Sequence, residues 1–128
     1  MDTNETIELF KQNVKKFEHL LKGLECDGAS RIIQYKMRRT GLWARKSYIM
    51  YGDELIPHYW CEHHTPNDII IFDYKSKMWF GDKALQGIFT MAQAFHNGVN
   101  YDGVDVKFNE EHTKLLILSQ NINKELKH

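Results

Sequence analysis

Several features that mark special classes of protein are scarce in this 128-residue chain. It has only two cysteines and two prolines, and its 17 basic residues balance its 17 acidic residues to a formal net charge of zero. Two cysteines are too few for a disulfide scaffold, and so little proline argues against a disordered chain. Because the chain lacks a surplus of positive charge, we expect neither nucleic acid nor a membrane as its partner.

Long hydrophobic runs are also missing. No stretch approaches the ~18 apolar residues of a membrane span, and residues 1–5 are polar and acidic, unlike the start of a signal peptide. These features predict a cytoplasmic protein. Hydrophobic residues nevertheless make up 42% of the chain, which is enough for a packed core. At this length the sequence predicts one domain over residues 1–128 and does not indicate an oligomeric state.

Hydrophobic spacing divides the first part of the chain into helices and strands. Apolar residues recur at intervals of three and four from Ile7 to Leu24, which is typical of an amphipathic helix. A second helix is expected to start at Cys26 or Asp27 and to end before Gly41. The next part predicts an antiparallel meander of three strands. These strands are expected over residues 47–51, 58–62 and 69–73, and the apolar run 69–72 indicates that the third is covered on both faces.

The C-terminal part predicts mainly helices. A short edge strand is expected at Trp79-Phe80, a helix over residues 84–97, and a strand over residues 104–108. The apolar residues Leu115, Leu118, Ile122 and Leu126 suggest a closing helix, although residues 115–118 read equally well as a strand. The fold class predicted for the chain is therefore α+β, with N-terminal helices packed on a small antiparallel sheet and further helices toward the C-terminus.

Three residues have the pattern of a thiol nucleophile and its activating groups. Cys26 is expected at the start of a helix, where the helix dipole and free N–H groups favour a thiolate. His58 and Asp73 are expected on neighbouring antiparallel strands, which bring side chains to within about 5 Å of each other. A cysteine, a base beside it and an acid that orients the base are what nucleophilic catalysis by a thiol requires.

The same residues resemble a known family. Cys26-Asp27-Gly28-Ala29-Ser30, His58-Tyr59-Trp60 and Ile70-Ile71-Phe72-Asp73 are similar to the core of the transglutaminase-like branch of the papain-like cysteine peptidase fold, over roughly residues 20–80. The resemblance implies a papain-like core in which Cys26 is the nucleophile, His58 the general base and acid, and Asp73 the orienting carboxylate. It also implies that Trp60 shields the site and contacts the substrate.

The chain departs from the family pattern in two ways. Tyr74 and Lys75 follow the acid, where family members often have a proline or a small residue. Members also use a polar side chain upstream of the cysteine to bind the oxyanion, and the sequence leaves Gln12, Asn13 or neither for this role. The expected function is a cofactor-independent acyl transfer on a protein or peptide: a peptidase, an amidase or deamidase, or a transferase.

Other interpretations remain open from the sequence. A protein with this fold can act as a non-enzymatic adaptor or inhibitor that only binds a partner. The cluster His58, Cys61, His63 and His64 has residue types found in zinc sites, but alternation along a strand sends His58 and Cys61 to opposite faces, and we expect no metal. A basic run from Arg31 to Lys46 is explained most simply by a solvated helix face, and it is also the best patch in the chain for nucleic acid or an acidic partner.

Overall fold

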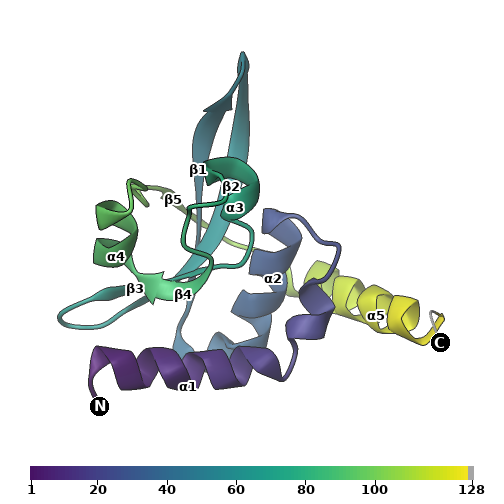
Figure 1. Cartoon of the computed structure of the whole chain (residues 1–128). Coiled ribbons are helices and arrows are strands. Elements are labelled where there is room, and N and C mark those ends of the chain that lie inside the picture. The colour runs from purple at the N-terminus through teal and green to yellow at the C-terminus, as the bar shows by residue number, and fades with distance from the viewer. Residues whose placement is uncertain (127–128) are drawn as a thin grey trace.

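The computed structural model describes residues 1–126 and combines helices with one antiparallel sheet. The strands of these residues are β1 (Trp43–Tyr51), β2 (Glu54–His64), β3 (Ile69–Asp73), β4 (Gly87–Thr90) and β5 (Val104–Val106). They follow the order β4-β3-β2-β1-β5, and every strand is antiparallel to its neighbours. The β1–β2 hairpin extends beyond the rest of the sheet (Figure 1). The predicted α+β class is confirmed.

The N-terminal helix α1 (Thr3–Lys15) is shorter than its apolar pattern predicts. Asp2 caps it by accepting a hydrogen bond of 2.8 Å from the backbone N–H of Glu5. After α1 the chain forms a separate 3-10 helix, η1 (Glu18–Leu21). The prediction of one helix reaching Leu24 is therefore wrong. The apolar spacing persists across the break because both segments contribute buried residues to the same core.

Helix α2 (Cys26–Lys36) begins at the predicted residue and packs against β2 (Figure 1). The last turn is followed by the 3-10 helix η2 (Arg38–Thr40), and Gly41 ends it with a φ of 74°. This left-handed conformation is one that glycine adopts without strain. The main core lies between α1, α2 and one face of the sheet, and its buried residues include Val14, Ile32, Ile33, Cys61, Ile70 and Phe72.

The three-stranded meander is confirmed. Gly52, with a φ of 64°, makes the turn between β1 and β2, and Cys61 of β2 pairs with Phe72 of β3. Adjacent residues of β3 enter different cores, since Ile70 packs in the main core while Ile71 packs in a second one on the other side of the sheet. The strand is thus covered on both faces, as its continuous apolar run predicts.

The segment after β3 differs from the prediction. Trp79 and Phe80 lie in the short helix α3 (Lys77–Phe80) and do not form an edge strand. The edge of the sheet is instead occupied by β4, which pairs with β3 over Ile70 to Asp73.

The predicted helix over residues 84–97 is divided into β4 and the shorter helix α4 (Met91–His96). Thr90 starts α4 with a reciprocal cap: its hydroxyl accepts from the N–H of Gln93, whose side chain accepts from the N–H of Thr90. The apolar residues before this cap pair with β3, so the tertiary pairing overrides their helical spacing.

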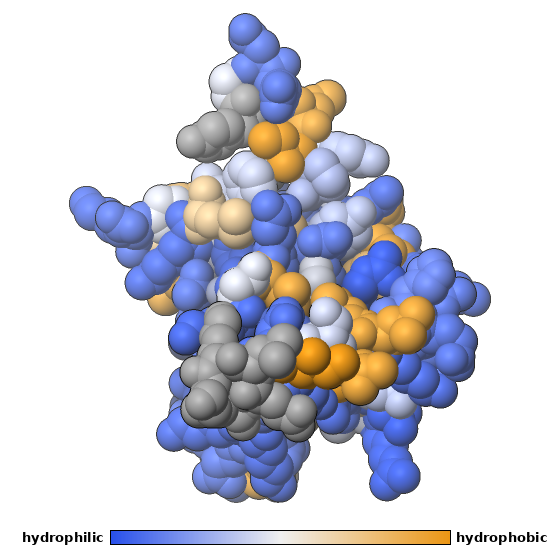
Figure 2. All heavy atoms as spheres, turned by 90° about the vertical axis from the view of Figure 1, so that its right-hand side faces the viewer, coloured by the Kyte–Doolittle hydropathy of each residue, from blue (hydrophilic) through white to orange (hydrophobic). Residues whose placement is uncertain are grey.

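The C-terminal region ends in β5 and helix α5 (Glu110–Leu126), which settles the ambiguity of residues 115–118 in favour of a helix. However, the apolar residues that predicted this helix do not lie on the face that packs against the core. Leu116 and Ile117 pack on the main core, whereas Leu115, Leu118 and Ile122 are exposed. Figure 2 shows apolar surface on the side of the molecule from which α5 projects. Among residues 1–126, none of the helices is long and apolar enough to span a membrane.

A glycine is required at position 103 because the backbone there passes close to Lys46 of β1 and to the ring of Trp60 in β2. A Cβ atom at this position would lie 2.5 Å from the carbonyl oxygen of Lys46 and 2.6 Å from the ring of Trp60. We expect Gly103→Ala to lower the free energy of unfolding by about 1–3 kcal/mol, because backbone and a buried ring must move. Urea unfolding measures this change in free energy. Gly28→Ala is the control, because the nearest atom to a Cβ at that position is 3.4 Å away. If Gly103→Ala destabilises the protein no more than Gly28→Ala, the packing described here is contradicted.

Candidate active site

The three residues singled out in the sequence lie together at the junction of α2 and the sheet. Cys26 is the first residue of α2, His58 lies within β2, and Asp73 is the last residue of β3. Their exposed fractions are 4%, 1% and 2%. A thiol, an imidazole and a carboxylate are therefore gathered in a nearly dry environment, where electrostatic interactions are stronger than in water.

Cys26 occupies the place where a helix presents unsatisfied backbone N–H groups. The preceding residue, Glu25, has extended backbone geometry and makes no side-chain cap. The first-turn amides of α2 are thus left without a capping side chain, and together with the helix dipole they favour negative charge at this end. The sulfur of Cys26 lies 3.8 Å from the carbonyl oxygen of Pro57, the residue before His58.

His58 is bound to Asp73 by a short hydrogen bond. Its Nε2–H donates to Oδ2 of Asp73 at 2.6 Å. The other ring nitrogen, Nδ1, is buried and has no partner within hydrogen-bond geometry. Because Nε2 is occupied by the carboxylate, Nδ1 is the nitrogen left to interact with Cys26, and it is the atom through which a proton can pass between the two side chains.

The surroundings of His58 favour its charged form. Burial by itself lowers the pKa of His58, but the hydrogen bond to Asp73 and the interaction with Cys26 outweigh burial and raise this pKa from 6.5 to about 9. At neutral pH the ring therefore carries a proton on both nitrogens. An imidazolium in this position can stabilise negative charge on the neighbouring sulfur and can release a proton to a leaving group.

Tyr101 adds a fourth group that the sequence did not identify. Its hydroxyl donates to Oδ2 of Asp73 at 2.7 Å, so one carboxylate oxygen accepts from both Tyr101 and His58. The other oxygen, Oδ1, accepts from the backbone N–H of Lys75 at 3.1 Å. Burial, followed by the charge of Asp73, raises the pKa of Tyr101, which keeps its hydroxyl protonated as a donor. Tyr101 lies 28 residues beyond Asp73 in a stretch without local pattern, so no sequence signal marked it.

Aromatic side chains enclose His58. The rings of His58 and Trp60 are stacked with centroids 6.0 Å apart, and the ring of Phe80 meets His58 edge-on at 5.3 Å. Trp60 is itself fixed, since its Nε1–H donates to the buried carboxylate of Glu62 at 2.7 Å. Trp60 therefore contacts His58, and its role toward a substrate stays a prediction, whereas Phe80 was expected in an edge strand and not here.

A small cavity of about 130 Å³ borders the site at His58 and Tyr101, and its lining does not include Cys26 or Asp73. His58, Trp60 and Tyr101 form buried parts of its wall, and the exposed residues Gly98 and Asn100 belong to the same lining. The remaining lining residues are Ser47, Phe80 and Val99. A volume of this size admits a small side chain and not a bulky ligand.

The other cysteine differs from Cys26 in its environment. Cys61 is fully buried in the main core, where its thiol donates to the carbonyl of Ser30 at 3.4 Å. Burial raises the pKa of the Cys61 thiol, which makes it a poor nucleophile. Cys61 and His58 thus lie on opposite faces of β2, as strand alternation predicts.

The histidines near Cys61 also have separate surroundings. The ring of His63 packs on Phe10 with centroids 5.1 Å apart, and Nε2 of His64 donates to Glu62 at 2.8 Å. Among the side chains that the structure describes, no group of three or more His, Cys, Asp or Glu is arranged to hold a metal ion.

The structure also bears on the residue that could bind an oxyanion. Asn13 lines a hollow with Lys36 and Met37, at the opposite end of α2 from Cys26. Gln12 is exposed on α1. Cys26 is the first residue of α2, so the first-turn amides of this helix are the backbone donors next to it in the chain.

Removing the Tyr101 hydroxyl tests its part in the site. We expect Tyr101→Phe to raise the pKa of His58 further, because a carboxylate with one donor fewer binds the imidazolium more strongly. The lost buried hydrogen bond should lower the free energy of unfolding by about 1–2 kcal/mol. NMR titration of the His58 ring measures the first effect, with Tyr74→Phe on the neighbouring half-buried tyrosine as the control. An unchanged or lower His58 pKa in Tyr101→Phe would contradict this role.

Comparison of the whole chain with protein-family models, with curated proteins and with solved structures gave no match.

Proposed function

We propose that this protein is a thiol-dependent acyl-transfer enzyme with a papain-like, transglutaminase-like core. The observation that carries the proposal is the buried hydrogen bond between His58 and Asp73, next to a cysteine at the start of a helix. Nε2 of this ring is bound to a carboxylate, Nδ1 is free of hydrogen bonds, and the ring interacts with Cys26. These are the three roles of nucleophile, base and orienting acid.

In the proposed first step Cys26, as a thiolate paired with the charged His58 ring, attacks the carbonyl carbon of an amide or thioester and forms a C–S bond. The carbonyl oxygen gains negative charge and is bound by the free amides at the start of α2. As the tetrahedral intermediate collapses, His58 gives its Nδ1 proton to the departing amine or thiol, and the original bond breaks. Cys26 is then acylated as a thioester and His58 is neutral.

In the second step neutral His58 takes a proton from the acceptor while the acceptor attacks the thioester carbonyl. Water as the acceptor releases an acid, and an amine releases a new amide. Either acceptor restores the Cys26 sulfur and the charged His58. Asp73 keeps the ring oriented in both steps and stabilises its charge, and Tyr101 holds Asp73 in place.

The proposed substrate is a protein or peptide with an exposed chain end or side chain. The cavity beside His58 is small, about 130 Å³, which suits a short side chain better than an extended small-molecule ligand. The chemistry needs no cofactor, because nucleophile, acid and oxyanion donors are all side chains and amides of this chain. We also propose the cytoplasm as its compartment, since a reducing environment preserves a free thiol nucleophile.

An activated ester tests the proposed chemistry without knowledge of the natural substrate. The protein is mixed with p-nitrophenyl acetate and the acetylated residue is located by mass spectrometry. We expect one acetyl group on Cys26, as a thioester that hydroxylamine removes at neutral pH. Adding methylamine distinguishes the two outcomes of the second step, since N-methylacetamide forms if amines are acceptors and only acetate forms if water is the acceptor.

Two variants complete this experiment. Cys26→Ser should abolish the hydroxylamine-sensitive adduct, whereas Cys61→Ala should retain it, because Cys61 is buried in the core away from His58. Acetylation of lysines alone, with none on Cys26, would favour the alternative of a non-enzymatic binding protein and would contradict the proposed function.

A further inference from the structure

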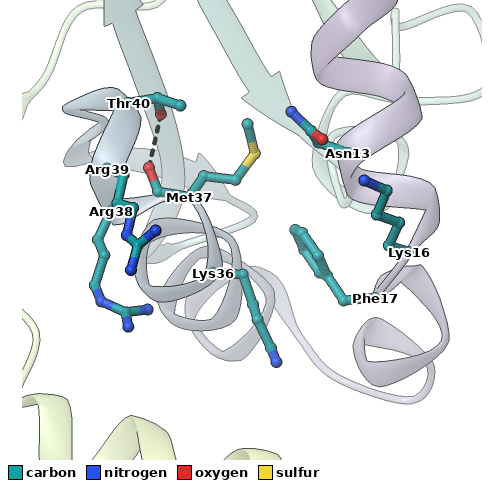
Figure 3. A pocket seen from close by; sticks show the side chains of 8 residues that line it. All are labelled: Asn13, Lys16, Phe17, Lys36, Met37, Arg38, Arg39 and Thr40. Carbon is teal, nitrogen blue, oxygen red and sulfur yellow. Dashed lines mark hydrogen bonds between the residues drawn. The ribbon is translucent and has the colours of Figure 1, made fainter.

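A basic hollow of about 420 Å³ lies at the far end of α2 from the candidate active site (Figure 3). One wall comes from the end of α1 and the other from the end of α2 and from η2. About 15 Å of helix separates Lys36 from Cys26, at 1.5 Å per residue, so the hollow is distinct from the triad. We call it the basic hollow, and its lining residues are Asn13, Lys16, Phe17, Lys36, Met37, Arg38, Arg39 and Thr40.

Half of the lining residues are cationic and none is acidic. The four cations are all exposed, and among the described side chains, which leave out residues 49, 51 and 124–128, none of them has a carboxylate within ion-pair distance. Arg38 is held in place by neutral groups only, donating to the carbonyl of Tyr35 at 2.8 Å and lying over the Tyr35 ring at 4.3 Å. Although the chain has a net charge of zero, the basic hollow therefore concentrates unpaired positive charge. Its concave shape focuses the electrostatic field of these cations.

Between the cations lies an apolar strip made by Phe17 and Met37, both largely buried. In Figure 3 the ring of Phe17 lies between the two helices, and Lys16 and Lys36 flank it from α1 and α2. A ligand that fits both features carries several negative charges around an apolar group. Because the cations stand on two separate walls, they favour a ligand whose negative charges are spread along a chain. A ligand with all its charge on one group would fit them less well.

The backbone around the basic hollow argues against a compact phosphate group. Phosphate sites at helices use N-terminal N–H groups, which point at the anion. Here both helices contribute their C-terminal ends, where carbonyl groups carry partial negative charge. The carbonyl of Tyr35 accepts from Arg38, and that of Met37 accepts from the hydroxyl of Thr40 at 2.6 Å. Long lysine and arginine side chains can reach carboxylates at some distance from these carbonyls.

We propose that the basic hollow binds an acidic segment of a partner protein, in which glutamates or aspartates surround an apolar residue. Its carboxylates pair with Lys16 on the α1 wall and with Lys36 or Arg39 on the wall of α2 and η2. Its apolar side chain covers the strip of Phe17 and Met37. This binding does not depend on the chemistry at Cys26. Because the cations are exposed, it weakens as the salt concentration rises.

A fluorescein-labelled peptide with four glutamates around one leucine tests the proposal by fluorescence anisotropy at low ionic strength. We expect binding to the wild-type protein and to Cys26→Ser alike, and at least about tenfold weaker binding to the double variant Lys16→Gln/Lys36→Gln. The control is Lys83→Gln/Lys107→Gln, which removes the same charge at two exposed lysines outside the hollow. It should bind within about twofold of the wild type.

Several results would overturn the proposal. One is an absence of peptide binding to the wild type, and another is an equal loss of binding in both double variants. A third is displacement of the labelled peptide by a lower concentration of inorganic tripolyphosphate than of unlabelled peptide, which would indicate a phosphate ligand. If circular dichroism shows that the Lys16→Gln/Lys36→Gln protein is unfolded, the single variant Arg39→Gln replaces it, with a weaker binding again expected. Loss of binding in Arg39→Gln without loss of acetylation at Cys26 would separate this site from the proposed enzyme function.

Discussion

Asp73→Asn should slow the acetylation of Cys26 by about a hundredfold or more. The physical reason is the balance of effects on His58, whose burial alone lowers its pKa while the interaction with Asp73 raises it. Without the carboxylate, less opposes the effect of burial, and the pKa of His58 falls from its value of about 9. A larger share of the rings is then neutral at pH 7, and a neutral ring does not stabilise negative charge on the sulfur.

Stopped-flow measurement of p-nitrophenol release follows this rate, and NMR titration of the His58 ring follows its pKa. Asp105→Asn is the matched control, because Asp105 makes an ion pair with Arg45 on the sheet and has no contact with the triad. Its acetylation rate should stay within about twofold of the wild type. If Asp73→Asn reacts as fast as Asp105→Asn, the carboxylate does not orient the base and the triad assignment fails.

The second large effect concerns stability as a function of pH. A group whose pKa is higher in the folded than in the unfolded protein stabilises the fold while it is protonated. For His58 this contribution is complete below pH 6.5 and is lost as the pH rises to about 9. The difference between 6.5 and about 9 corresponds to about 3 kcal/mol of unfolding free energy.

Urea unfolding of the wild type and of His58→Gln at a series of pH values isolates this contribution. Glutamine can still donate to Asp73 but does not titrate, and all other titrating groups are common to the two proteins. The stability advantage of the wild type should therefore shrink by about 3 kcal/mol between pH 6.5 and pH 9.5. An advantage that stays constant over this range would mean that His58 is not a charged partner of Asp73.

The positions of Cys26, His58 and Asp73 were accessible from sequence because each depends on a local pattern. Cys26 starts a helix that ends at a glycine turn, and His58 and Asp73 lie on strands joined by a short polar loop. Hairpin pairing then limits where the two strands can place their side chains. The hydrogen bond between His58 and Asp73 follows from this local geometry. The catalytic role given to these residues remains a prediction.

Other features depended on contacts that no local pattern records. Tyr101 reaches Asp73 across 28 residues of chain, and residues 87–90 form a strand only because β3 offers an edge to pair with. In α5 the residues at helical spacing, Leu115 and Leu118, are exposed, whereas Leu116 and Ile117 between them pack on the core. Spacing identifies an amphipathic helix, but only the tertiary structure decides which of two apolar faces is covered.

The basic hollow illustrates the same limit at the level of function. The basic run from Arg31 to Lys46 was visible in the sequence, yet Lys16 of α1 belongs to the same surface and is far from that run in the chain. Arg45, in contrast, is part of the run but pairs with Asp105 and lies near Glu62 in the sheet. A charge count along the sequence therefore did not identify the cations that share one concave surface.

The reactivity of the two cysteines toward iodoacetamide tests the central claim most directly. Limited alkylation near neutral pH, quantified by mass spectrometry, compares Cys26 with Cys61 in the same molecule. We predict that Cys26 of the wild type reacts at least about tenfold faster than Cys61, and that His58→Gln removes most of this difference. Equal rates for the two cysteines in the wild type, or a Cys26 rate that does not depend on His58, would contradict the assignment of Cys26 as an activated nucleophile.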